Sequence, residues 1–118
     1  MLYRLESRWY GCHPPLIGKY GDDVFLWLDD IRKMPAGYTH HARSVNEAKR
    51  MIIAAERRGE CVELLDLDHD LGDYAYDGGD GIRLIDWLLE RGTLYRITLH
   101  TANPVGRANM QRMIDRFW

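Results

Sequence analysis

Apolar residues along the chain form runs of strand length, separated by stretches with helical spacing. Residues 24–28 and 61–67 are largely apolar, and residues 95–99 form a third run of the same kind. The run at 24–28 is apolar on both faces, which is typical of a strand inside a parallel sheet. We predict a strand there and in each of the other two runs. Residues 38–43 are predicted to form a short additional strand.

Helices are predicted between these strands. Ser44 and Glu47 have the spacing of a capping box, and the helical pattern that follows predicts a helix over residues 45–58. A second helix ends at Gly92, because glycine is favoured just after a helix. We expect Asp80 to be the N-cap of this second helix.

The last helix is predicted to follow Asn103, since asparagine is a favoured N-cap residue. Strands and helices therefore alternate, which predicts a three-layer α/β fold. Its parallel sheet has about four strands joined by right-handed crossovers. Residues 2–5 are predicted as an N-terminal edge strand. The length fits one domain, assigned to residues 23–118, preceded by an N-terminal extension over residues 1–22.

Composition excludes several classes of protein. Sixteen basic and eighteen acidic residues nearly cancel, so no net field favours nucleic acid or an anionic membrane. No apolar run is long enough to span a membrane, and the N-terminus lacks the apolar core of a signal peptide. Cys12 and Cys61 make neither a metal-binding spacing nor a disulfide framework, so we expect reduced thiols and a cytoplasmic location.

Polar, chemically capable residues follow each of the three strongest strands. These are Asp29-Asp30, Asp68-His69-Asp70 and His100-Thr101. In open parallel sheets, ligands bind beyond the carboxyl ends of the strands. The coincidence of three such strand ends predicts a functional site at this edge of the sheet.

The acidic residues predict a site for a divalent cation. Asp29 and Asp30 repel each other unless a positive charge lies nearby, and carboxylate oxygens are ligands that suit Mg²⁺. Asp68 would complete a cluster of three carboxylates, and Asp70 is either a further ligand or a turn former. Alternatively, one of the first pair caps a turn and the other is solvated. Asp66 is expected to lie deeper or to pair with a neighbour.

The remaining strand-end residues suit phosphate chemistry. Histidine as a residue type titrates near neutral pH, so His69 or His100 could transfer a proton, or each could be a hydrogen-bonded structural histidine. Arg32 could pair with an aspartate or bind a phosphate. Thr101 and Asn103 precede a helix whose first N–H groups could bind an anion, although Asn103 could serve only as the N-cap.

Three blocks of the sequence, LWLDDIR, LDHDLG and ITLHTANPVGRANM, resemble the cyclic-phosphate-processing receiver domain family. The resemblance covers residues 24–117 and implies a receiver-like, flavodoxin-like fold. It also implies that Asp29, Asp30 and Asp68 hold Mg²⁺. In receivers the central aspartate accepts a phosphoryl group and a Ser or Thr responds to it, roles that fall on Asp68 and Thr101.

The chain departs from the phospho-accepting receivers. We expect it to lack the lysine that ends their fifth strand, and we expect no full first helix between Asp30 and Tyr38. These departures disfavour phosphorelay and favour a re-purposed site. A true phospho-accepting receiver is therefore the third hypothesis.

The first hypothesis is a metal-dependent hydrolase that acts on a cyclic phosphate of the nucleotide or RNA-end type. Its residues are, for catalysis, Asp68, His69 and His100; for substrate binding, Arg32, Thr101 and Asn103; and for Mg²⁺ or Mn²⁺, Asp29, Asp30, Asp68 and Asp70. The second hypothesis is a non-catalytic module that binds a phosphorylated ligand or a protein partner. No feature of the sequence indicates an oligomeric state.

Overall fold

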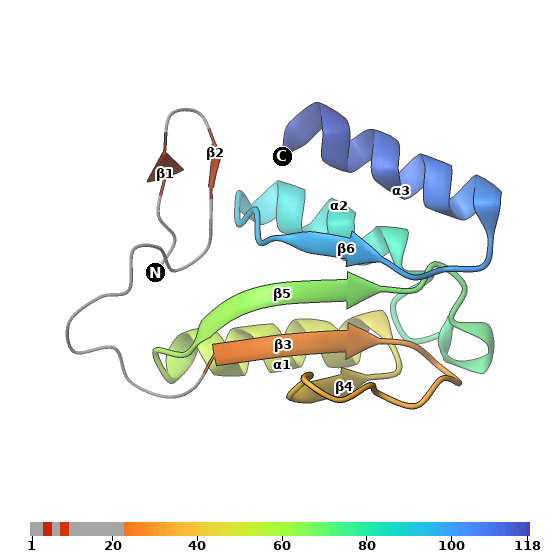
Figure 1. Ribbon diagram of the computed structural model, residues 1–118, viewed down its shortest axis with the longest axis horizontal. Coiled ribbons are helices and arrows are strands. Elements are labelled where there is room, and N and C mark those ends of the chain that lie inside the picture. The colour runs from red at the N-terminus through yellow and green to blue at the C-terminus, as the bar shows by residue number, and fades with distance from the viewer. Residues whose placement is uncertain (1–3, 6–7, 10–22) are drawn as a thin grey trace.

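The computed structural model describes residues 4–5, 8–9 and 23–118. Its main sheet has four strands in the order β4-β3-β5-β6, and every pairing is parallel (Figure 1). The strands are β3 (Asp23–Leu28), β4 (His40–Ala42), β5 (Cys61–Leu67) and β6 (Ile97–Leu99). The predicted parallel sheet of about four strands is confirmed.

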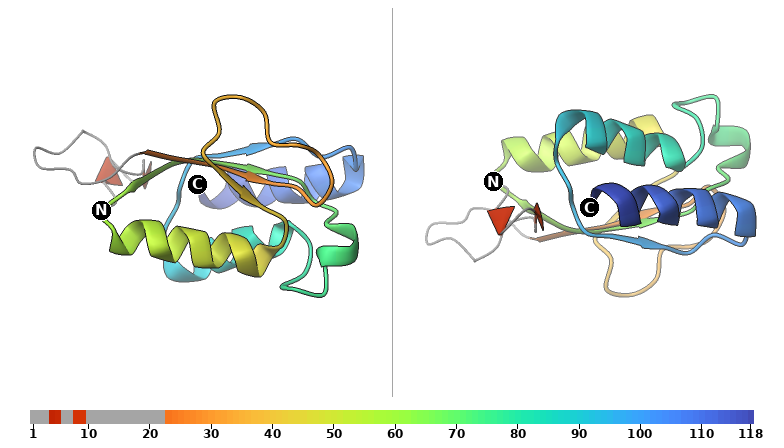
Figure 2. Two further views of the ribbon diagram at one scale, coloured as in Figure 1. Left: turned by 90° about the horizontal axis from the view of Figure 1, so that it is seen from below. Right: turned by 90° about the horizontal axis from the view of Figure 1, so that it is seen from above.

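Three helices cover one face of this sheet. They are α1 (Val45–Arg57), α2 (Ile82–Arg91) and α3 (Pro104–Phe117). Figure 2 shows all three on the same side, whereas the segment between β3 and β4 crosses the opposite side. A short 3-10 helix, η1 (Gly72–Tyr74), follows β5. In the part of the chain that the structure describes, no helix is long and apolar enough to cross a membrane.

The prediction that residues 2–5 add an edge strand to the parallel sheet is wrong for residues 4–5, which are the part of it that the structure describes. β1 (Arg4–Leu5) pairs antiparallel with β2 (Arg8–Trp9) in a separate two-stranded sheet rather than with the main sheet. The other residues of the segment assigned to an N-terminal extension lie outside the described residues.

The alternation of side chains along β3 and β5 separates the core from the site. Leu26 and Leu28 on β3 are fully buried on the helix-covered side, beside Leu65 and Leu67 of β5. Together with the inner faces of the three helices they form the apolar core. Because successive side chains on a strand point to opposite faces, Trp27, Asp29, Asp66 and Asp68 point away from this core.

The helix ends show which capping predictions hold. Ser44 caps α1 by accepting a hydrogen bond from the Glu47 N–H, as predicted. Asn103 caps α3 by accepting from two N–H groups of the first turn, also as predicted. The prediction for Asp80 is wrong. Gly81 is the N-cap of α2, and Asp80 Oδ1 instead accepts a hydrogen bond from the Leu71 N–H, 3.1 Å away.

Candidate functional site

A pocket of about 340 Å³ lies at the carboxyl ends of β3, β5 and β6. Seven of the predicted site residues line it: Asp29, Asp30, Arg32, Asp68, Asp70, Thr101 and Asn103. Ile31, Gly72 and Ala102 complete the lining. The structure therefore brings together the ends of three separate strands, as the parallel topology predicts.

Asp29 is the most deeply buried acid of the pocket, at 1% exposure. Its Oδ1 accepts hydrogen bonds from the backbone N–H groups of Ile31, at 2.8 Å, and Arg32, at 2.7 Å. Its Oδ2 lies 2.9 Å from His100 Nε2. Burial raises the pKa of Asp29, but the two N–H groups and His100 outweigh that effect and bring the pKa below its ordinary value.

The pKa of Asp68 is shifted in the opposite direction, above its ordinary value. Its Oδ1 accepts a hydrogen bond from the His69 N–H at 2.8 Å, and its side chain also hydrogen bonds with Thr101. Burial raises the pKa of Asp68 despite these bonds, and the negative charge of Asp29 raises it further. A carboxyl group in this situation gains from a nearby cation, because the cation offsets the repulsion between the two acids.

Three potential metal-ligand atoms converge here, one each from Asp29, Asp68 and His100, all within 4.8 Å of one another. Each carboxylate oxygen carries more than one lone pair, so the hydrogen bonds to Asp29 leave acceptor capacity for a cation. The two carboxylate oxygens of this set suit Mg²⁺ or Mn²⁺.

Asp30 reaches the pocket because the facing residue is a glycine. Gly72 has a φ of +50°, and a Cβ at this position would lie 2.5 Å from Asp30 Oδ2. Any larger residue would therefore collide with the carboxylate and be strained in its backbone. The Asp30 carboxylate thus lies against the chain that leaves β5.

Arg32 provides a cation at the rim of the pocket. Its Nη1 donates a hydrogen bond to the backbone oxygen of His100 at 2.8 Å, which joins the segment after β3 to the end of β6. The side chain is exposed. A guanidinium group has five N–H donors, so this bond leaves donors available for a bound anion.

Like His100, His69 is not part of the lining of this pocket. Its Nδ1 lies 2.7 Å from Asp70 Oδ1, and Asp70 also accepts hydrogen bonds from Asn103 Nδ2. The imidazole packs over Gly106 of α3, where a Cβ would lie 2.5 Å from the ring. Asn103 therefore both caps α3 and holds Asp70, and this group ties the end of β5 to the third helix.

His100 lies between two buried carboxylates. Its Nδ1 is 2.7 Å from Asp66 Oδ1, and its Nε2 is 2.9 Å from Asp29 Oδ2. The ring stacks on Trp27, with centroids 3.7 Å apart and planes 5° apart. Burial lowers the pKa of His100, but the two carboxylates outweigh it and raise the pKa above its ordinary value. Since both ring nitrogens face acceptors, this geometry favours the doubly protonated imidazolium.

The sequence predicts the surroundings of His100 only in part. The expectation that Asp66 lies deeper or pairs with a neighbour holds, because Asp66 pairs with His100 and with the Tyr38 hydroxyl. The sequence predicts Tyr38 only as part of a short strand, and that strand begins at His40. The hydrogen bond from Tyr38 to Asp66, with burial and the Asp66 charge, raises the pKa of Tyr38 to about 12.

Stability should fall on the alkaline side because of His100. A raised pKa in the folded state means that the stabilisation is fully present below the ordinary pKa of 6.5 and is lost as the pH rises through the raised value. Urea unfolding curves across this range should show the fall in the wild type and a smaller one in His100→Gln. Equal slopes for the two proteins would contradict the prediction.

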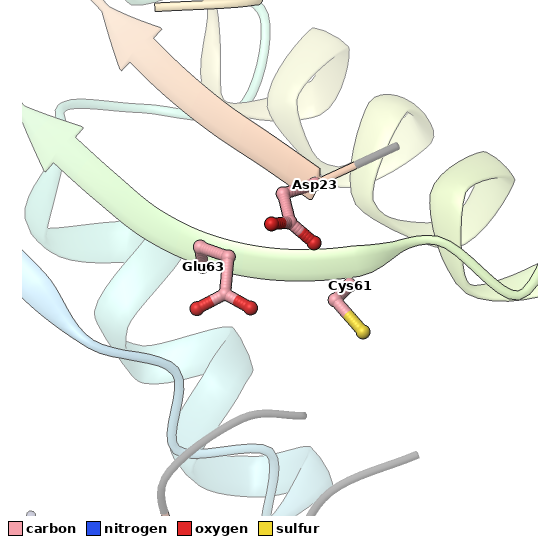
Figure 3. A group of neighbouring side chains, drawn as sticks. All are labelled: Asp23, Cys61 and Glu63. Atoms are coloured by element: carbon pink, nitrogen blue, oxygen red, sulfur yellow. The ribbon is translucent and has the colours of Figure 1, made fainter. Parts of the chain in front are cut away.

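A second group of potential ligand atoms lies at the opposite, amino end of the sheet. Asp23 is at the start of β3, and Cys61 and Glu63 are near the start of β5 (Figure 3). Their ligand atoms also lie within 4.8 Å of one another. Because this group is at the far end of the strands, it is separate from the pocket.

The parallel sheet, with acids after β3 and β5 and a threonine after β6, defines a receiver-like domain. The family model of the cyclic-phosphate processing receiver domain matches residues 24–116, and the chain belongs to this family. Comparisons with curated proteins and with solved structures give no match.

Proposed function

We propose that this domain is a metal-dependent phosphoesterase that opens cyclic phosphates in the pocket at the ends of β3, β5 and β6. The observation that supports it most is the convergence of Asp29, Asp68 and His100 beside the exposed Arg32. The family to which the chain belongs is described by the processing of cyclic phosphates, which agrees with this chemistry.

In this proposal Asp29, Asp30 and Asp68 hold Mg²⁺ or Mn²⁺, with Asp70 at the rim of the pocket. Such an ion would polarise a phosphoryl oxygen and lower the pKa of a water molecule. Carboxylates supply the negative charge that this cation requires.

The other residues bind the substrate and transfer a proton. Arg32 and the Thr101 hydroxyl bind phosphoryl oxygens, at the end of the pocket that Asn103 shapes by capping α3. A water oxygen forms a bond to phosphorus while one ester P–O bond of the ring breaks. The leaving oxygen takes a proton from His100 Nε2, and the proton lost by the water returns His100 to its starting state through solvent. The sequence also predicts His69 as catalytic, but the packing of its ring against Gly106 of α3 and its bond to Asp70 favour His100 for this step.

Metal binding is the first test. Calorimetric titration of Mg²⁺ and Mn²⁺ should show saturable binding to the wild type and binding at least about tenfold weaker to Asp68→Asn, which removes a charged ligand without changing its shape. Asp115→Asn, on the exposed surface of α3, is the matched control and should bind like the wild type. Fluorescence of Trp27 offers a second readout, because its ring stacks on His100.

Turnover is the second test. With metal present, the wild type should convert members of a panel of nucleoside 2′,3′- and 3′,5′-cyclic phosphates into phosphate monoesters. Failure to convert any of them, in the presence of either metal, would contradict the proposed activity.

The alternative is a module that binds a phosphorylated ligand or a protein partner without chemistry. It is favoured by the bond between His100 Nε2 and Asp29, which could make His100 a structural counter-charge for buried acids. Saturable binding of a cyclic nucleotide without product after long incubation would support this alternative.

A further inference from the structure

Asp66 is a buried acid that lines neither the pocket nor the apolar core. It is the second-last residue of β5, opposite Thr98 of β6, and is 8% exposed. Its side chain points to the face of the sheet that the segment between β3 and β4 crosses, like those of Asp68 and Trp27. It thus lies one side-chain layer below the acids of the pocket.

Both oxygens of Asp66 are engaged. Oδ1 lies 2.7 Å from His100 Nδ1, and Oδ2 accepts a hydrogen bond from the Tyr38 hydroxyl. Thr98 also hydrogen bonds with the carboxylate. These contacts come from two separate parts of the chain, the segment before β4 and the end of β6, so the Asp66 carboxylate is held from both.

Two contacts fix the ring of His100: one sets the plane of the ring, and the other sets its rotation within that plane. Stacking on Trp27 sets the plane of the ring, and Trp27 is itself held edge-to-face by Tyr38, with centroids 5.3 Å apart. Within that plane, the bond from Nδ1 to Asp66 determines which nitrogen faces Asp29, an acid that lines the pocket. That nitrogen is Nε2, in the group of ligand atoms with Asp29 and Asp68.

We propose that Asp66, held by Tyr38, is the positioning residue that directs the Nε2–H of His100 towards the leaving oxygen of the substrate. This inference rests on the proposed function, in which His100 donates that proton. A carboxylate on the far nitrogen of a histidine fixes both its tautomer and its orientation. In the same step the leaving oxygen gains the Nε2 proton as its bond to phosphorus breaks, while Nδ1–H stays bonded to Asp66.

Packing alone does not explain an acid at this position. Buried ion pairs are weak contributors to stability, and apolar residues of similar size often replace them without loss. Asp66 differs from an apolar residue in accepting hydrogen bonds, and it uses this capacity on His100 and on the tyrosine that packs against Trp27.

The test uses two substrates with the same five-membered cyclic phosphate but different leaving oxygens. In cytidine 2′,3′-cyclic phosphate the leaving group is an alcohol, which needs a proton. In catechol cyclic phosphate it is a phenol, which leaves as an anion far more easily. A residue that acts through a proton donor should matter for the first substrate and much less for the second.

For Asp66→Asn, kcat on the cytidine substrate should fall about a hundredfold with KM nearly unchanged, because the amide cannot hold the same tautomer of His100. On the catechol substrate the fall should be less than about fivefold. Tyr38→Phe keeps the aromatic ring and should show the same pattern at smaller size, which preserves the test if Asp66→Asn does not fold. Asp115→Asn is the control and should behave as the wild type.

Proton and nitrogen NMR of His100 provides a readout that does not depend on activity. The wild type should show a hydrogen-bonded Nδ1–H signal that Asp66→Asn loses. An active wild type whose variants lose kcat equally on both substrates would overturn the inference but leave the proposed function intact. A wild type inactive on all cyclic phosphates would contradict the proposed function, and the NMR signal would then decide alone whether Asp66 positions His100. Absence of that signal in the wild type would overturn the inference.

Discussion

His100→Ala is expected to lower the free energy of unfolding by about 3–5 kcal/mol, because it leaves buried carboxylates without their cationic partner. Asp29 and Asp66 are 1% and 8% exposed, and His100 lies between them. Each acid retains other hydrogen bonds, but none of these supplies a positive charge. Urea denaturation at pH 6, without added metal, measures the effect.

His40→Ala is the matched control for this variant. His40 lies on β4 and contacts Thr39 through its Nδ1 rather than a buried acid. Its replacement should change the free energy of unfolding by only about 0.5 kcal/mol. Equal losses in the two variants would show that the acids around His100 do not depend on its charge.

Gly81→Ala is expected to destabilise the fold by about 3 kcal/mol and to weaken the proposed binding of Mg²⁺ or Mn²⁺. A Cβ at Gly81 would overlap the carbonyl oxygen of Asp68, and the Gly81 N–H already donates to the His69 oxygen at 2.7 Å. The obstacle is backbone, so it cannot rotate away. Either the start of α2 or the end of β5 must therefore shift. A shift at the end of β5 would move Asp68, which directly follows that strand.

Gly106→Ala tests whether a side-chain obstacle costs less stability than the backbone obstacle at Gly81. A Cβ at Gly106 would meet the His69 ring, which can turn about its own bonds. Alanine also favours helix over glycine by about 1 kcal/mol, which offsets part of the cost. We expect a clearly smaller loss of stability than for Gly81→Ala, measured by the same urea denaturation. A loss as large as that of Gly81→Ala would contradict this explanation.

The fold could be predicted because its strongest signals are local. The apolar runs at 24–28 and 61–67 are central strands, and the helix predicted at 45–58 is observed as Val45–Arg57. The error at Asp80 arose because the neighbouring loop folds back. A carboxylate near a predicted helix start can cap the helix or, as here, accept a hydrogen bond from a distant N–H.

The site could be located from the sequence, but its internal contacts could not be assigned. Strand ends meet at one edge of a parallel sheet, which brings Asp29, Asp68 and Thr101 together. The pattern does not distinguish His69 from His100, because their difference depends on tertiary neighbours. The ring of His69 packs against Gly106 of α3. The ring of His100 stacks on Trp27 and pairs with Asp66.

Tyr38 illustrates the limit of periodicity most directly. It precedes the short strand β4, and its hydroxyl reaches Asp66 on β5 across the face of β3. Periodicity predicts the face to which a strand residue points, but not the loop residue that will cover that face.

The wholly parallel pairing of the main sheet also bears on how quickly the domain folds. No neighbouring pair in this sheet can be closed by a two-residue hairpin, since parallel strands require a crossover. Chain entropy must therefore be lost before the first contacts between β3 and β5 stabilise the chain. Refolding should accordingly be slower than that of small helical bundles, and the acidic edge can assemble only after this search.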